Sequence, residues 1–270
     1  MKVEAGLGTA GNERARFASF EGVWIMSGKT DRRGASGAQT PQPPMGVDSA
    51  ERARATPGTS SGMSATRITV TALGLLSATV GVEHGLGAIE QGTDAPPGLV
   101  FRSWPDAAAF DALGGEPALT LVPNLLITGV LAVLTCVALG VWTLWGAHHR
   151  LWGAGLVALS MLQLLCGGGF GPPIIGLVAG LLATRVGHTW ATPGGRATDL
   201  AARLWPWPLV LAVSSFLMLV PGFQILFVLS GSVSPTLVGP VTLAAFASTA
   251  LAVISARASD RVVARRSAPA

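Results

Sequence analysis

Long apolar segments, almost free of charged residues, constrain this 270-residue chain more than any other feature. A helix that crosses a lipid bilayer needs about 20 predominantly apolar residues. Segments of this kind recur from residue 68 to residue 256. Only 12% of the residues are charged, against about 25% in an average soluble domain. The sequence therefore predicts an all-α, polytopic helical membrane bundle, and it disfavours a soluble globular enzyme, a disordered chain and a nucleic-acid binder.

About six membrane segments are expected within a transmembrane domain that covers residues 63–257. Four segments have spanning length, and two shorter ones flank a glycine- and proline-rich turn; in chain order they are 68–89, 119–144, 151–166, 174–184, 209–229 and 237–256. The uncharged stretch 151–184 is too long for one span, and four glycines with two prolines at 167–173 break a helix there. This stretch is predicted to form a broken hairpin, with a re-entrant loop as the alternative.

Charge predicts the orientation, because arginine and lysine favour the cytoplasmic side of a membrane. The connection 90–116 carries five acidic residues and one arginine, so we expect it outside. Arg150, Arg185 and the basic tail 258–270 are expected in the cytoplasm, as are both termini. The lysine-poor, alanine- and glycine-rich composition is typical of GC-rich bacterial genomes, which predicts a bacterial inner (plasma) membrane.

The first 62 residues differ from the rest of the chain. They are rich in Gly, Ser, Pro, Thr and Arg and show no apolar periodicity. Such a segment cannot bury enough surface to offset its chain entropy, so we expect a disordered N-terminal tail. Met63 stands directly before the first span, and translation from Met63 is an equal alternative.

Ionisable and polar residues inside the predicted spans are the candidate site. A charged side chain in a span costs at least about 2.5 kcal/mol when exposed to lipid, and such residues usually face the bundle interior. The candidates are Glu83, His84, Asn124, Gln163 and Gln224, together with the broken-helix turn Gly167, Gly168, Gly169, Phe170, Gly171, Pro172 and Pro173. Discontinuous helices often mark substrate or ion sites in transporters.

These residues favour small-solute or ion translocation, with a proton-linked mechanism. The alternative is a non-catalytic membrane subunit or assembly partner, in which the polar residues only hold the bundle together. The connection 90–116 is expected to contain a short amphipathic helix that begins at Ser103 and ends at Gly114 and Gly115.

The sequence does not predict an enzyme. It lacks HExxH and GxSxG motifs, and no residue is assigned a catalytic role. His148 and His149 lack further metal-type partners, so no metal site is predicted, and no cofactor is implied. The expected partner is the lipid bilayer; a membrane-protein partner or a homo-oligomer is left open, and no nucleic acid is expected despite a pI near 10.0.

Two strings carry a resemblance to known sequences. GVEHGLGAIEQG (Gly81–Gly92) and GGGFGPPIIGLVAG (Gly167–Gly180) resemble strings in uncharacterised multi-pass prokaryotic membrane proteins. The resemblance covers the membrane part of the chain. It implies a multi-pass helical fold, and it supplies no activity and no catalytic residue.

Overall fold

The structure is a computed structural model, and it describes residues 63–187 and 195–267, which form one helical domain. Its α-helices are α2 (Ala65–Glu90), α3 (Leu125–Trp145), α4 (Trp152–Leu165), α5 (Gly171–Ala183), α6 (Arg196–Leu204), α7 (Trp207–Leu217), α8 (Phe223–Ser230) and α9 (Val238–Ser267). The predicted all-α class is confirmed. The tail 1–62, for which disorder is predicted, lies outside the described residues.

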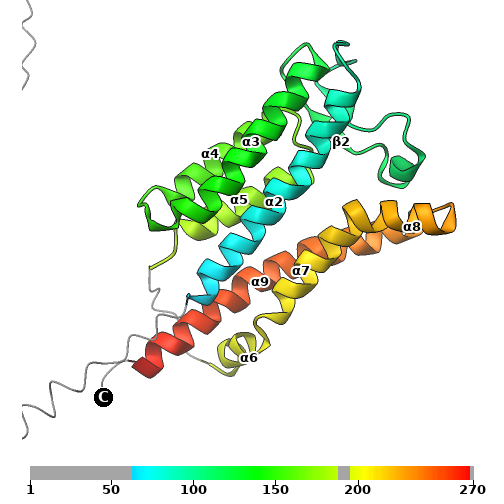
Figure 1. The fold of residues 1–270 in the computed structure, drawn as a ribbon. Coiled ribbons are helices and arrows are strands. Elements are labelled where there is room, and N and C mark those ends of the chain that lie inside the picture. Colours follow the sequence, from blue (N-terminus) through cyan, green and yellow to red (C-terminus); the bar gives the residue numbers. More distant parts are fainter. Residues whose placement is uncertain (1–62, 188–194, 268–270) are drawn as a thin grey trace, which may run out of the picture. The chain divides into compact units, whose positions relative to one another are not determined.

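Helix α2 is the central element of the domain. It packs against α3 and α5 and also contacts α7 and α9, while α4 pairs with α5 and α7 pairs with α9 (Figure 1). Glycines permit the close approach of α2 and α3, because a side chain on Gly129 would overlap the backbone of Gly85. Small residues at helix crossings are typical of helices that associate in a bilayer.

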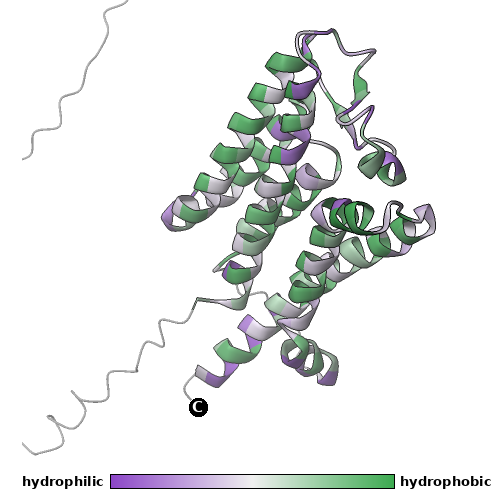
Figure 2. Cartoon of the chain, turned by 45° about the vertical axis from the view of Figure 1, so that its right-hand side comes forward, coloured by the Kyte–Doolittle hydropathy of each residue, from purple (hydrophilic) through white to green (hydrophobic). Residues whose placement is uncertain are grey.

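Within the residues that the structure describes, four helices are long and apolar enough to cross a membrane. They are Ala65–Glu90, Leu125–His148, Trp207–Ser230 and Pro235–Ser267. Apolar residues cover most of their length, and hydrophilic residues concentrate toward their ends and in the connections (Figure 2). Helices α4 and α5 are apolar but shorter, with 14 and 13 residues. The expected count of about six spans is therefore not confirmed. The described residues contain four helices of spanning length and a shorter pair, α4 and α5.

The turn between α4 and α5 is shorter than the sequence predicts. The prolines of the motif do not break a helix but begin one: Pro172 and Pro173 lie in the first turn of α5, which starts at Gly171. A proline is tolerated there because the first backbone N–H groups of a helix have no partner within it. The non-helical part is limited to residues 166–170, where Gly167 and Gly169 adopt positive φ.

The expected span 209–229 is a helix with a widened turn. Residues Met218–Gly222 form a π-helical turn that contains Pro221 and joins α7 to α8 without a break. A proline inside a helix removes one backbone hydrogen bond, and a π-turn is one way in which the chain accommodates it.

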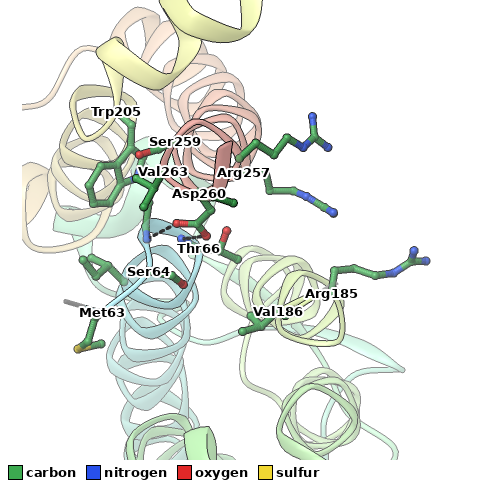
Figure 3. A pocket seen from close by; sticks show the side chains of 15 residues that line it. Met63, Ser64, Thr66, Arg185, Val186, Trp205, Arg257, Ser259, Asp260 and Val263 are labelled. Carbon is green, nitrogen blue, oxygen red and sulfur yellow. Dashed lines mark hydrogen bonds between the residues drawn. The ribbon is translucent and has the colours of Figure 1, made fainter. Parts of the chain in front are cut away.

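The last helix extends beyond the predicted span. Helix α9 continues to Ser267, through the basic residues assigned to a separate tail. Near its end, Asp260 accepts hydrogen bonds from the backbone nitrogens of Ala65 (2.7 Å) and Thr66 (3.1 Å) at the start of α2. Figure 3 shows this contact at the wall of a cavity of about 550 Å³. The two ends of the described domain are thus joined by one carboxylate.

The connection between α2 and α3 is not the amphipathic helix that the sequence predicts from Ser103. It contains a two-stranded antiparallel sheet of β1 (Val100–Arg102) and β2 (Pro117–Leu119), and a 3-10 helix at Ala108–Leu113. The expected start at Ser103 is wrong because the backbone N–H groups of Ser103 and Trp104 extend the strand pairing, to the carbonyls of Glu116 and Gly115. The expected end is confirmed, since Gly114 is the left-handed cap of the 3-10 helix.

Candidate functional site

A carboxylate–imidazole–carboxylate cluster lies where the α2–α3 connection folds onto α2. Glu83 and His84 lie in α2, and Glu116 directly precedes β2. His84 Nδ1 lies 3.3 Å from Glu83 Oε2, and His84 Nε2 lies 3.6 Å from Glu116 Oε2. The structure therefore brings together two predicted site residues and one that the sequence analysis counted only as an acidic loop residue.

Local backbone geometry delivers Glu116 to this position. Gly114 and Gly115 adopt φ values of 68° and 73°, and Glu116 itself has a φ of 52°. Non-glycine residues with positive φ are uncommon, and this conformation costs about 1–2 kcal/mol. The backbone N–H of Ser103 holds the turn by donating to the Glu116 carbonyl at 3.0 Å. The fold thus keeps a strained residue whose side chain reaches His84.

The cluster is shielded from solvent, and much of its hydrogen-bonding capacity is unused. The side chains of His84 and Glu116 are only 7% and 5% exposed, and that of Glu83 is 20% exposed. Within the described residues, both Glu83 carboxylate oxygens and Glu116 Oε2 are buried without a hydrogen-bond partner. Buried polar atoms of this kind are rare in folded proteins and call for a ligand, water or proton.

Burial, and secondly the neighbouring Glu83 carboxylate, raise the pKa of Glu116 to about 10. Glu116 is therefore protonated at neutral pH in the absence of a ligand. Two carboxyl groups and an imidazole at these separations can share a proton, or they can hold a cation that compensates their charge.

The imidazole of His84 is fixed on two sides. Its Nδ1 lies 3.2 Å from the carbonyl oxygen of Val80, one turn earlier in α2. Gly169, in the turn between α4 and α5, lies against the other side of the ring, and a side chain at this position would overlap it. The backbone of the glycine-rich turn thus packs directly against the imidazole.

Trp104 forms another side of the cluster. It neighbours the Glu83 carboxylate, and its ring stacks on Phe110 with 4.9 Å between centroids. Its indole Nε1 is buried and has no hydrogen-bond partner among the described residues. The same tryptophan lines a cavity of about 320 Å³ together with Gly87, Glu90, Gln91 and Ser103.

The other predicted site residues do not join this cluster. Asn124 caps α3, accepting from the Ile127 nitrogen at 3.0 Å and donating to the Thr93 carbonyl at 3.1 Å. Gln224 lies in α8, and its Nε2 is buried without a hydrogen-bond partner in the described part of the chain. Among the described residues, neither Asn124 nor Gln224 forms a hydrogen bond with Glu83, His84 or Glu116.

Gln163 is the centre of a separate buried network. Its amide nitrogen donates to the Ser77 carbonyl (3.0 Å) and to Cys136 Sγ (3.3 Å). Its Oε1 accepts from the Ser77 hydroxyl at 3.1 Å, and that hydroxyl also lies 2.6 Å from the Pro172 carbonyl. This arrangement links α2, α3, α4 and α5 and satisfies the amide, so its evident role is to fix packing.

Sequence reasoning missed Glu116 because its charge was interpreted only as a marker of orientation. The available signal was local: an acid directly after two glycines and before the apolar strand residues Pro117–Leu119.

No known protein family, curated protein or solved structure matches this chain.

Proposed function

We propose that this chain is an integral membrane protein that translocates a small cation or a proton, and that Glu83, His84 and Glu116 are its ion-binding site. One observation carries the proposal: a 95% buried carboxyl group, Glu116, faces an ionisable pair on a helix of spanning length. Ionisable groups in spans usually mark ion pathways or proton relays. A proton-linked mechanism requires a carboxyl group that can gain and lose a proton beside the imidazole, and Glu116 stands at that position.

The proposed topology follows from the charges. The α2–α3 connection faces the outside, and both termini with the basic end of α9 face the cytoplasm of a bacterial inner membrane. Helices α4 and α5 then form a hairpin whose turn lies beside His84. In this arrangement the ion site lies toward the outside, next to the cavity lined by Glu90, Gln91 and Trp104.

A second function is supported by a different observation. The turn between α4 and α5 is filled by side chains: Gly167 packs on Thr128, Gly168 on Gln163 and Gly169 on His84. A filled turn leaves little room for a pathway beside it, and it favours a non-transporting subunit or assembly partner whose polar residues fix the bundle.

Flux measurements on reconstituted protein test the first function against the second. Proteoliposomes with an internal pH dye, energised by a potassium diffusion potential, should show proton entry above that of protein-free liposomes. We expect Glu83→Gln and Glu116→Gln to reduce the rate at least tenfold. Asp94→Asn is the matched control, because Asp94 is an exposed acid in the α2–α3 connection that lines neither the cluster nor the cavity beside Trp104.

Two results would contradict translocation. The first is a wild-type flux equal to that of empty liposomes, both for protons and for Na⁺, Mn²⁺ and Zn²⁺ tested in the same way. This result would refute translocation and favour the non-transporting subunit. Unchanged flux in both glutamate variants would remove the cluster from the mechanism.

A further inference from the structure

We propose that Glu83, His84 and Glu116 form a binding site for a divalent transition-metal ion of the zinc type. The ligands are His84 Nε2 and one oxygen from each carboxylate. The proposal deepens the proposed function, on which it rests for its role in transport, because it names the class of cation; binding itself is measured separately.

The donor atoms already stand at the separations that a metal ion requires. One ligand atom from each residue lies within 4.8 Å of the other two. Neighbouring ligands of a tetrahedral zinc ion are about 3.4 Å apart, given bond lengths of about 2.0–2.2 Å. The separation of His84 Nε2 and Glu116 Oε2 is 3.6 Å, so small side-chain movements suffice.

The imidazole is oriented as a metal ligand is. Histidine ligands almost always donate the second ring N–H to a carbonyl or carboxylate, and this bond fixes the tautomer and the ring. Here Nδ1 faces the Val80 carbonyl at 3.2 Å, which leaves Nε2 with its lone pair toward Glu116. Gly169 packs closely beside Nε2, and a side chain at this position would overlap the ring.

Unused acceptors point to a cation. Glu116 is 5% exposed, and its Oε2, which faces His84, has no hydrogen-bond donor in the described residues. Both oxygens of Glu83 are in the same condition. In the described part of the chain, the ion pairs of both carboxylates are with His84 alone. A doubly charged ion would compensate two buried carboxylates that one imidazole cannot.

The donor set selects the kind of metal. Calcium prefers six to eight oxygen ligands, and magnesium keeps an octahedral shell with several waters. One imidazole and two carboxylates suit zinc, manganese or iron(II), and three protein ligands leave a position free for water or a further ligand. The cavity of about 320 Å³ lies next to the site, because Trp104 lines this cavity and also neighbours Glu83.

Equilibrium dialysis of the purified, chelator-stripped full chain in detergent tests the site. The protein should carry no histidine tag, and bound Zn²⁺ is measured by mass spectrometry. We expect about one tightly bound zinc ion per chain. His84→Ala and Glu116→Gln should each weaken binding at least tenfold, and Asp94→Asn and His148→Ala should not. Cobalt(II) substituted for zinc should show the visible absorption of a tetrahedral nitrogen- and oxygen-ligated ion.

Circular dichroism and size-exclusion profiles check that each variant is folded. Glu116→Gln keeps the shape of the side chain, and the wild-type stoichiometry and cobalt spectrum need no variant. Absence of bound zinc in the wild type overturns the proposal, as does equal affinity in folded Glu116→Gln. Proton flux without metal binding would refute the metal site and leave translocation standing. Metal binding without any flux would support the metal site and refute translocation.

Discussion

Replacing Asp260 should destabilise the domain, because this residue joins the end of α9 to the start of α2. The Asp260 carboxylate accepts two backbone hydrogen bonds at the start of α2, from residues 195 and 194 positions away in the chain. A hydrogen bond to a charged group contributes about 1.5–3 kcal/mol when buried, and a negative charge at a helix start adds about 0.3–1 kcal/mol. Because this site is only partly buried, we take the lower values and expect Asp260→Ala to cost about 3 kcal/mol.

The assay is unfolding by sodium dodecyl sulfate in mixed micelles, followed by circular dichroism. Asp260→Asn keeps one acceptor oxygen and should lose about half as much stability as Asp260→Ala. Asp199→Ala is the control, since Asp199 likewise places a carboxylate at the start of a helix, here its own helix α6, but is exposed. A loss below about 0.5 kcal/mol for Asp260→Ala, or one equal to that of Asp199→Ala, would refute the idea that α9 holds the start of α2.

Three further predictions concern the bundle, the pH response and the topology. Gln163→Leu should lower the free energy of unfolding by about 2 kcal/mol, because it leaves buried partners unpaired, whereas Gln224→Leu, measured alongside, should change it little. Glu116 stays protonated up to about pH 10 in the folded protein but ionises above about pH 4.5 in the unfolded chain. The free energy of unfolding of the metal-free protein should therefore fall as the pH rises between these values, by up to about 1.4 kcal/mol per pH unit. The facing groups, Glu83 and His84, remain in Glu116→Gln, so an equal slope in that variant would refute the assignment. A cysteine at Ser232→Cys should react with an impermeant maleimide from outside intact cells, and labelling only from the cytoplasm would invert the topology.

The long helices could be predicted from the sequence because a helix of spanning length needs about 20 apolar residues with little charge, and a single segment displays this by itself. Helix α2 was expected at 68–89 and runs from Ala65 to Glu90. The ends were less predictable. Helix α9 runs past its apolar part because exposed arginines are good helix formers, and its end is held by Asp260.

The site could be predicted only in part. Glu83 and His84 stand out as ionisable residues within an apolar segment, but Glu116 reaches them through three successive residues with positive φ and a strand pairing across the connection. Such contacts depend on the tertiary fold, and no local pattern encodes them. The Ser103 start failed for the same reason: a capping motif is local, whereas the pairing of Ser103 with Glu116 is not.

The origin of Glu116 in a later segment has a consequence for how the protein is made. A ribosome completes α2, with Glu83 and His84, before it reaches Glu116. In the proposed topology the helix therefore enters the membrane with two polar groups whose final neighbour does not yet exist. The α2–α3 connection must first pass through the membrane and fold back before these groups are enclosed. With that topology, assembly of the site would be a late step of biogenesis, completed only after the α2–α3 connection has been translocated.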